Sequence, residues 1–136
     1  MIKKITFSFL FIFVLTLVSC SKDDDASGGD VGIRPPEWIQ GTWLVEDTFG
    51  GPDQGFRFTS DDVISLQPTL EYSLKEAGEF YVNAGEEVSV ENTSTETFYE
   101  MKMNIPGGQT VVYSFELVRD NVIIWKQAST TEFLRQ

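Results

Sequence analysis

The chain has 136 residues, and its 21 acidic residues outnumber its 10 basic residues, which gives a net charge of −11. A surface of this sign repels nucleic-acid phosphates, so we expect no nucleic-acid partner. The sequence contains no histidine, which removes Ser-His-Asp and Cys-His catalysis and the imidazole ligands of most protein metal sites. We therefore expect neither an enzyme nor a cofactor or resident metal.

The N-terminus combines a basic start with a short apolar run from Ile5 to Val18. This run is shorter than the roughly 20 residues of a membrane-spanning helix, and its layout predicts a signal peptide over residues 1–19. The residues Leu17-Val18-Ser19-Cys20 at its end resemble the lipobox of bacterial lipoproteins. The resemblance implies cleavage before Cys20, the only cysteine, and a lipid on its thiol. A multi-chain lipid anchor would hold the protein on a membrane without a spanning helix.

The residues behind the cysteine, Lys22, Asp23, Asp24 and Asp25, resemble the export signal of surface lipoproteins in the Bacteroidota. This resemblance implies display on the outer face of the outer membrane. The stretch Ser21–Pro36 is rich in Asp, Gly, Ser and Pro, a composition that cannot bury enough apolar surface to fold. We therefore expect a lipidated, flexible acidic tether over residues 20–36 and one domain over residues 37–136.

The first half of this domain reads as short strands followed by one helix. Strands are expected at residues 42–46, 56–59 and 63–66, where apolar residues alternate with polar ones or form short runs. The helix is expected over Pro68–Gly78, because Thr69 can cap its start and Gly78 can end it.

The second half reads as strands throughout. Thr97–Ile105 and residues 111–117 have the clearest alternation of apolar and polar residues in the chain. Further strands are expected at residues 80–82, 88–90, 122–126 and 132–134. About eight short strands at this spacing predict an all-β domain, a small antiparallel barrel with one short helix. An open barrel and a β-sandwich are the alternatives.

Gly41-Thr42-Trp43 at the first strand resembles the Gly-x-Trp motif of the lipocalin and fatty-acid-binding-protein superfamily. The longer stretch Glu37–Trp43 resembles the opening of small lipocalin-like lipoproteins of the Bacteroidota. The resemblance implies a lipocalin-like barrel whose closed end is formed by Gly41, Trp43 and Arg135, with the arginine stacked over the indole. It also implies that the first and last strands pair.

The leading functional hypothesis is a surface-tethered, non-catalytic binding module for a small apolar or amphipathic ligand, or for a glycan on an exposed aromatic face. The alternative is a protein-interaction or inhibitor module whose barrel is filled by side chains. A continuous apolar cavity would favour the first hypothesis, and a packed interior would favour the second. The acidic pairs Asp61-Asp62 and Glu86-Glu87 are candidates for loose cation contact. The candidate ligand-contacting residues are Trp38, Tyr72, Tyr81, Tyr99, Met101, Met103 and Trp125.

Overall fold

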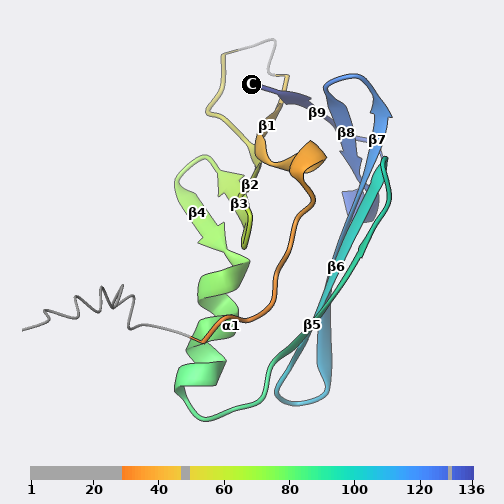
Figure 1. The fold of residues 1–136 in the computed structure, drawn as a ribbon. Coiled ribbons are helices and arrows are strands. Elements are labelled where there is room, and N and C mark those ends of the chain that lie inside the picture. The colour runs from red at the N-terminus through yellow and green to blue at the C-terminus, as the bar shows by residue number, and fades with distance from the viewer. Residues whose placement is uncertain (1–28, 47–49, 129) are drawn as a thin grey trace, which may run out of the picture.

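The computed structural model of the chain describes residues 29–46, 50–128 and 130–136. Its nine strands form one antiparallel sheet in the order β4-β3-β2-β1-β9-β8-β7-β6-β5, which curls into a half-barrel (Figure 1). No helix in this part of the chain is long and apolar enough to cross a membrane. The elements are η1 (Glu37–Ile39), β1 (Gly41–Val45), β2 (Gly55–Phe58), β3 (Val63–Gln67), β4 (Leu70–Ser73), α1 (Leu74–Asn83), β5 (Ser89–Ser94), β6 (Phe98–Ile105), β7 (Gln109–Arg119), β8 (Val122–Trp125), η2 (Lys126–Ala128) and β9 (Glu132–Arg135).

The predicted all-β fold with one helix is confirmed, and the sheet takes the open-barrel form. The first and last strands pair as expected, with Trp43 opposite Arg135 and Val45 opposite Phe133. This pairing lies in the middle of the sheet, however, and the two edges are β4 and β5. The chain passes from β4 to β5 through α1 rather than through a hairpin, so the sheet opens at this point.

Residues 29–36 run between α1 and β5, across the opening of the half-barrel (Figure 1). Val31 and Ile33 are buried, with exposed fractions of 6% and 0%. The predicted tether over residues 20–36 is therefore wrong for this last part, which belongs to the folded domain. The composition of the stretch is polar as a whole, but these two side chains supply enough apolar surface to fill the gap in the sheet.

The side chain of Asn92 on β5 holds this segment in place. Its Oδ1 accepts a hydrogen bond from the backbone N–H of Arg34 at 2.9 Å, and its Nδ2 donates to the carbonyl oxygen of Gly32 at 2.7 Å. One amide side chain thus satisfies a backbone donor and a backbone acceptor, as a neighbouring strand would. Residues 29–36 therefore cover the open side of the half-barrel without adding a strand to the sheet.

Helix α1 begins at Leu74, six residues after the predicted start at Pro68. Residues 70–73 form the edge strand β4, and Ser73 caps α1 by accepting a hydrogen bond from Glu76 N at 3.0 Å. Gly78 lies inside the helix, where an added Cβ would come within 2.9 Å of Val31 Cγ1. This glycine permits close packing rather than ending the helix. The strand expected at residues 80–82 is consequently wrong, because these residues continue α1.

The interior of the half-barrel is filled by aromatic side chains from opposite walls. Phe56 and Phe58 lie on β2, and their ring centroids are 4.9 and 4.8 Å from that of Phe115 on β7. Because β1, β9 and β8 separate these two strands in the sheet, rings in contact leave no room for a ligand between the walls at this level. The core also contains Ile33, Ile39, Trp43, Val63, Leu74, Tyr99, Met101, Met103, Ile123 and Phe133.

Candidate functional site

The end of the half-barrel next to η1 is formed by Trp43 and Arg135. The guanidinium carbon lies 4.3 Å from the centroid of the indole, within the range of a cation–π contact. Arg135 also donates from Nη1 to the carbonyl oxygen of Gln40 at 2.8 Å and from Nη2 to that of Trp38. Trp43 is fully buried, and its Nε1 donates to the carbonyl oxygen of Ile39 at 2.6 Å. The N–H groups of Arg135 and Trp43 that make these hydrogen bonds are therefore not free to bind a ligand.

Gly41 completes this end of the barrel. Its φ of +124° is a conformation that other residues rarely adopt. A Cβ at this position would also lie 3.2 Å from Arg135 Nη1. The structure therefore brings together Gly41, Trp43 and Arg135, and their contacts are structural.

Further along β1 and β9 from Trp43 and Arg135 lies a groove of about 310 Å³, which we call the mouth groove. It opens where β1 ends and β2 begins, beside the turn between β3 and β4. Its lining combines the apolar side chains of Val45, Phe56, Trp125 and Phe133 with the polar side chains of Gln54, Ser65 and Gln67. Small-molecule sites are usually concave and mostly apolar, whereas apolar and polar groups line this open groove in similar measure.

Trp125 is the central aromatic residue of this groove. Tyr113 stacks on its ring with a centroid distance of 5.5 Å and an interplanar angle of 10°, and Phe56 meets it edge-on at 5.2 Å. Within the described residues, Trp125 Nε1 is buried and has no hydrogen-bond partner. A buried donor without a partner costs about 1–3 kcal/mol. Because this nitrogen has no exposed surface, a ligand acceptor would reach the N–H only after the neighbouring side chains move.

Strand β4 follows the turn that borders the groove and carries exposed side chains. Tyr72 pairs with Ser65 and Leu70 pairs with Gln67, and paired residues of antiparallel strands point to the same face of the sheet. Tyr72 and Leu70 are 45% and 57% exposed. Burial raises the pKa of the Tyr113 hydroxyl, and the nearby Tyr72 raises it further, so Tyr113 stays protonated at neutral pH. Of these aromatic residues Trp125 lines the groove itself, Tyr113 stacks on Trp125, and Tyr72 lies on β4 beside the groove. We call Tyr72, Tyr113 and Trp125 the aromatic rim.

Four of the other five aromatic and methionine candidates serve the fold, and Tyr81 is the exception. Tyr99 is fully buried and donates to Asn92 Oδ1 at 3.0 Å, and burial raises the pKa of its hydroxyl. Trp38 donates from Nε1 to the carbonyl oxygen of Thr95 at 2.9 Å. Met101 and Met103 fill the core. Tyr81 lies on α1, where its ring meets that of Phe80 at 5.6 Å.

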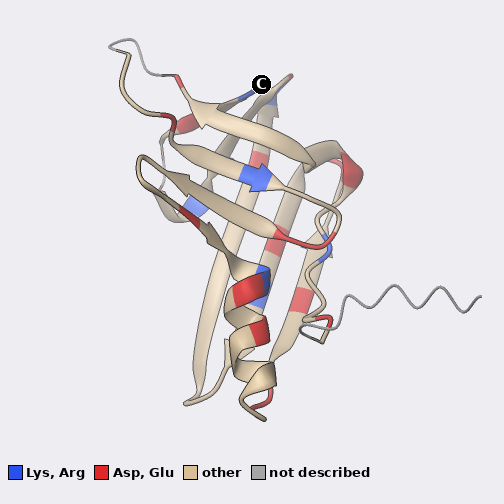
Figure 2. Cartoon of the chain, turned by 90° about the vertical axis from the view of Figure 1, so that its left-hand side faces the viewer, with Lys and Arg blue, Asp and Glu red and all other residues tan. Residues whose placement is uncertain are grey.

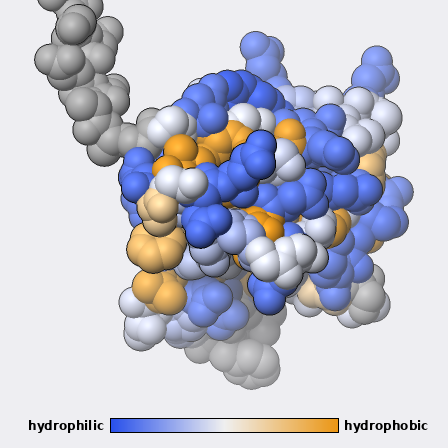
Figure 3. Space-filling view, turned by 90° about the horizontal axis from the view of Figure 1, so that it is seen from below, coloured by the Kyte–Doolittle hydropathy of each residue, from blue (hydrophilic) through white to orange (hydrophobic). Residues whose placement is uncertain are grey.

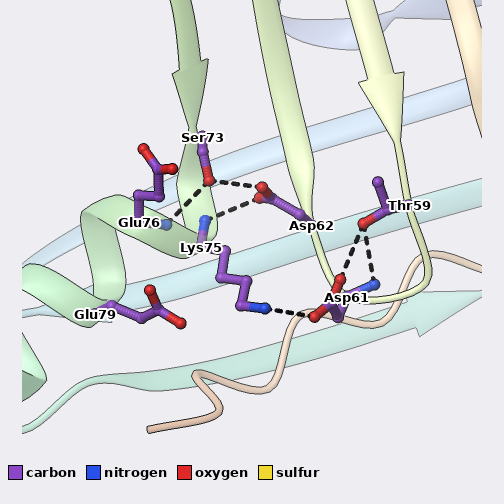
Figure 4. A pocket seen from close by; sticks show the side chains of 7 residues that line it. All are labelled: Thr59, Asp61, Asp62, Ser73, Lys75, Glu76 and Glu79. Atoms are coloured by element: carbon purple, nitrogen blue, oxygen red, sulfur yellow. Dashed lines mark hydrogen bonds and ion pairs between the residues drawn. The ribbon is translucent and has the colours of Figure 1, made fainter. Parts of the chain in front are cut away.

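The acidic pair Asp61-Asp62 lies in a polar pocket of about 380 Å³ beside the start of α1 (Figure 4). Asp61 pairs with Lys75 Nζ at 2.6 Å, which lowers the pKa of its carboxyl group. Asp62 is buried and accepts hydrogen bonds from Ser73 Oγ and from Lys75 N at the helix start. Both carboxylates thus stabilise the junction of β4 and α1.

The second acidic pair, Glu86-Glu87, is exposed in the loop after α1. Among the described residues, no group of three or more His, Cys, Asp or Glu side chains has the arrangement of a metal site. The predicted lipidation residue Cys20 and the predicted export signal Lys22–Asp25 lie outside the described residues.

Comparisons of this chain with protein-family models, with curated proteins and with solved structures found no match. The functional argument therefore depends on the residues of the chain itself. Sequence reasoning identified Trp125 and Tyr72 but missed Tyr113, Phe56 and Phe133 as their neighbours. The alternation over residues 111–117 had placed Tyr113 on the inner face, but only the pairing of β7 with β8 brings it onto Trp125.

Proposed function

We propose that the protein is a lipid-anchored, non-catalytic binding module that holds a small uncharged ligand, a sugar ring or an amphipathic molecule of similar size, in the mouth groove. The observation that carries this proposal is Trp125, whose stacked indole lines the groove and whose buried N–H lacks a partner. Aromatic rings cover the apolar face of a sugar or a hydrocarbon, and the indole N–H would donate to a hydroxyl or carbonyl oxygen of the ligand.

The packed interior limits the form of the ligand. Phe56 and Phe115 are in contact below the groove, so a long acyl chain has no path into the barrel. The groove volume of about 310 Å³ is at the lower end of the roughly 300–1,000 Å³ range of small-molecule sites. A ring lying across the aromatic rim fits these limits better than an enclosed lipid tail.

The proposed cellular location follows from the N-terminal sequence, and the proposed family follows from the Gly41-Thr42-Trp43 motif. The lipobox ending in Cys20 and the export signal Lys22–Asp25 support a lipoprotein on the outer surface of the outer membrane. The stacking of Arg135 on Trp43 beside Gly41, with β1 paired to β9, supports a lipocalin-like protein of the Bacteroidota type.

Replacement of Trp125 by phenylalanine tests the ligand site. Trp125→Phe retains an aromatic face but lacks the N–H, so it should weaken the binding of a neutral oligosaccharide or a non-ionic amphiphile by about 0.5–1.5 kcal/mol, roughly two- to tenfold. Binding is measured by calorimetric titration of the purified protein against panels of both ligand classes. Because the N–H has no partner within the described chain, any loss in the free energy of unfolding should come from the smaller ring packed against Phe56 and Tyr113.

Trp38→Phe is the matched control, because it removes an indole N–H that already bonds to Thr95. This variant should lose folding stability and keep its ligand affinity. Binding by Trp125→Phe that equals the wild type, or a wild-type protein that binds neither panel, would contradict the proposed site.

The alternative function, a protein-interaction or inhibitor module, is supported by the same packed interior. The exposed Leu70 on the edge strand β4 would then contact a partner protein directly. A photo-reactive amino acid at position 70 distinguishes the two functions on intact cells. Cross-linking to one specific protein, together with no binding in the ligand panels, would favour the interaction module.

Surface display is tested with a protease added to intact cells. If Asp23, Asp24 and Asp25 direct export, the protease should remove the wild-type domain. The triple alanine replacement of these residues should leave the lipoprotein on the inner side and protect it. Wild-type protein that is cleaved only after the cells are broken would show that the surface assignment is wrong.

A further inference from the structure

Phe80 on α1 is an exposed aromatic side chain that the mouth groove does not use. Its exposed fraction of 71% is the highest among the exposed large apolar residues of the described chain, which are Leu70, Tyr72, Phe80 and Val118. Tyr81 meets its ring edge-on at 5.6 Å and is itself partly exposed. Phe80 and Tyr81 lie in the half of the helix that points away from β4 (Figure 1), and we call them the helix tip.

The chain that leads to the proposed lipid anchor enters the domain beside this helix tip. A Cβ at Gly29 would lie 3.4 Å from Val82 Cγ1, so the first described residue rests against the helix two residues from Phe80. Cys20 precedes Gly29 by nine residues, and a chain of this length spans at most about 30 Å. A lipid on Cys20 would therefore hold the helix tip close to the membrane surface.

Uncharged and acidic residues both surround Phe80. Its helix neighbours one turn further on, Asn83 and Ala84, carry no charge, whereas Glu76 lies one turn before it and Glu86 and Glu87 follow the helix. Acidic residues lie along α1 (Figure 2), and Glu79 directly precedes Phe80. Their carboxylates would stay in water at the level of the headgroups while the two aromatic rings insert. Apolar side chains also reach the surface at the lower end of the molecule (Figure 3).

We propose that the helix tip, Phe80 with Tyr81, inserts into the membrane surface to which the lipid anchor attaches the protein. This inference rests on the proposed lipidation of Cys20. One or two aromatic side chains bind a bilayer weakly, but an anchor already in the membrane raises their effective concentration at its surface. The contact then fixes the orientation of the domain. Because β4 runs from the mouth groove directly into α1 (Figure 1), insertion of the helix tip turns the groove away from the membrane.

The test places an environment-sensitive fluorophore at the helix tip of the full-length, membrane-processed protein. In the lipoprotein the Cys20 sulfur carries lipid, so Phe80→Cys introduces the only free thiol. Val118→Cys is the matched control, because Val118 is also exposed and lies at the β7–β8 end of the sheet, away from α1 (Figure 1). Each labelled protein is reconstituted into phosphatidylcholine vesicles that contain a nitroxide-labelled lipid.

The emission at position 80 should shift to shorter wavelength, and nitroxide lipid should quench it several-fold more strongly than the emission at position 118. Interfacial side chains reach about 5–10 Å into the boundary between headgroups and acyl chains, within the range of the nitroxide. Equal quenching at the two positions in a vesicle-bound protein would overturn the inference. A wild-type chain that takes up the dye has a free Cys20 thiol, which would contradict the lipid anchor and the inference that rests on it.

Discussion

Replacing Trp43 by alanine is expected to lower the free energy of unfolding by about 3–5 kcal/mol, the range for deleting a large buried aromatic side chain. Trp43 is fully buried in the core and pairs with Arg135 across β1 and β9. The replacement leaves a cavity and removes the hydrogen bond from Nε1 to the carbonyl oxygen of Ile39. The loss is a large share of the roughly 5–15 kcal/mol that stabilises a typical domain.

The measurement is urea unfolding followed by far-ultraviolet circular dichroism, which does not depend on the deleted indole. Arg135→Ala should cost about 1–3 kcal/mol, because it removes the cation–π contact together with the hydrogen bonds to Gln40 and Trp38. The two losses should not add in the double variant, since the residues contact each other. A cost of less than about 1 kcal/mol for Trp43→Ala would show that this end of the barrel does not need its indole.

Replacing Cys20 by alanine is expected to abolish retention of the protein in the membrane fraction or to block its processing. The thiol of Cys20 is the only sulfhydryl group in the chain, and it is the proposed point of lipid attachment. No helix in the described part of the chain is long and apolar enough to cross a membrane. The loss should therefore be nearly complete rather than partial, because a multi-chain lipid accounts for almost all of the membrane affinity.

Fractionation of cells followed by immunoblotting measures this effect, and mass spectrometry of the membrane-bound wild type identifies the lipid. Ser21→Ala is the matched control, because it changes the neighbouring residue and leaves the thiol in place. Processed Cys20→Ala protein that stays in the membrane fraction would refute lipid anchoring at this residue.

The sequence by itself determined the two longest strands, β6 and β7, and the identity of the barrel-end residues. Alternation over Thr97–Ile105 and residues 111–117 reports burial of one face of each strand, and β6 and β7 occupy these positions. The Gly41-Thr42-Trp43 motif and Arg135 near the C-terminus were also identified from short stretches of sequence. In each case the pattern lies within a few residues. Successive side chains of a strand point to opposite faces, so a short stretch is enough to show which face is buried.

The tertiary structure alone decided how the sheet is closed and where a ligand would lie. Val31 and Ile33 stand in a polar stretch that gives no periodic signal, and they are buried only because the gap beside α1 and β5 accepts them. The start of α1 depends on Asp62, which lies far from the helix in sequence and caps it only after β3 and β4 pair. The mouth groove likewise joins residues of β2, β3, β8 and β9. Such sites arise from long-range pairing, and a pattern confined to one segment carries no information about the partner that another segment will supply.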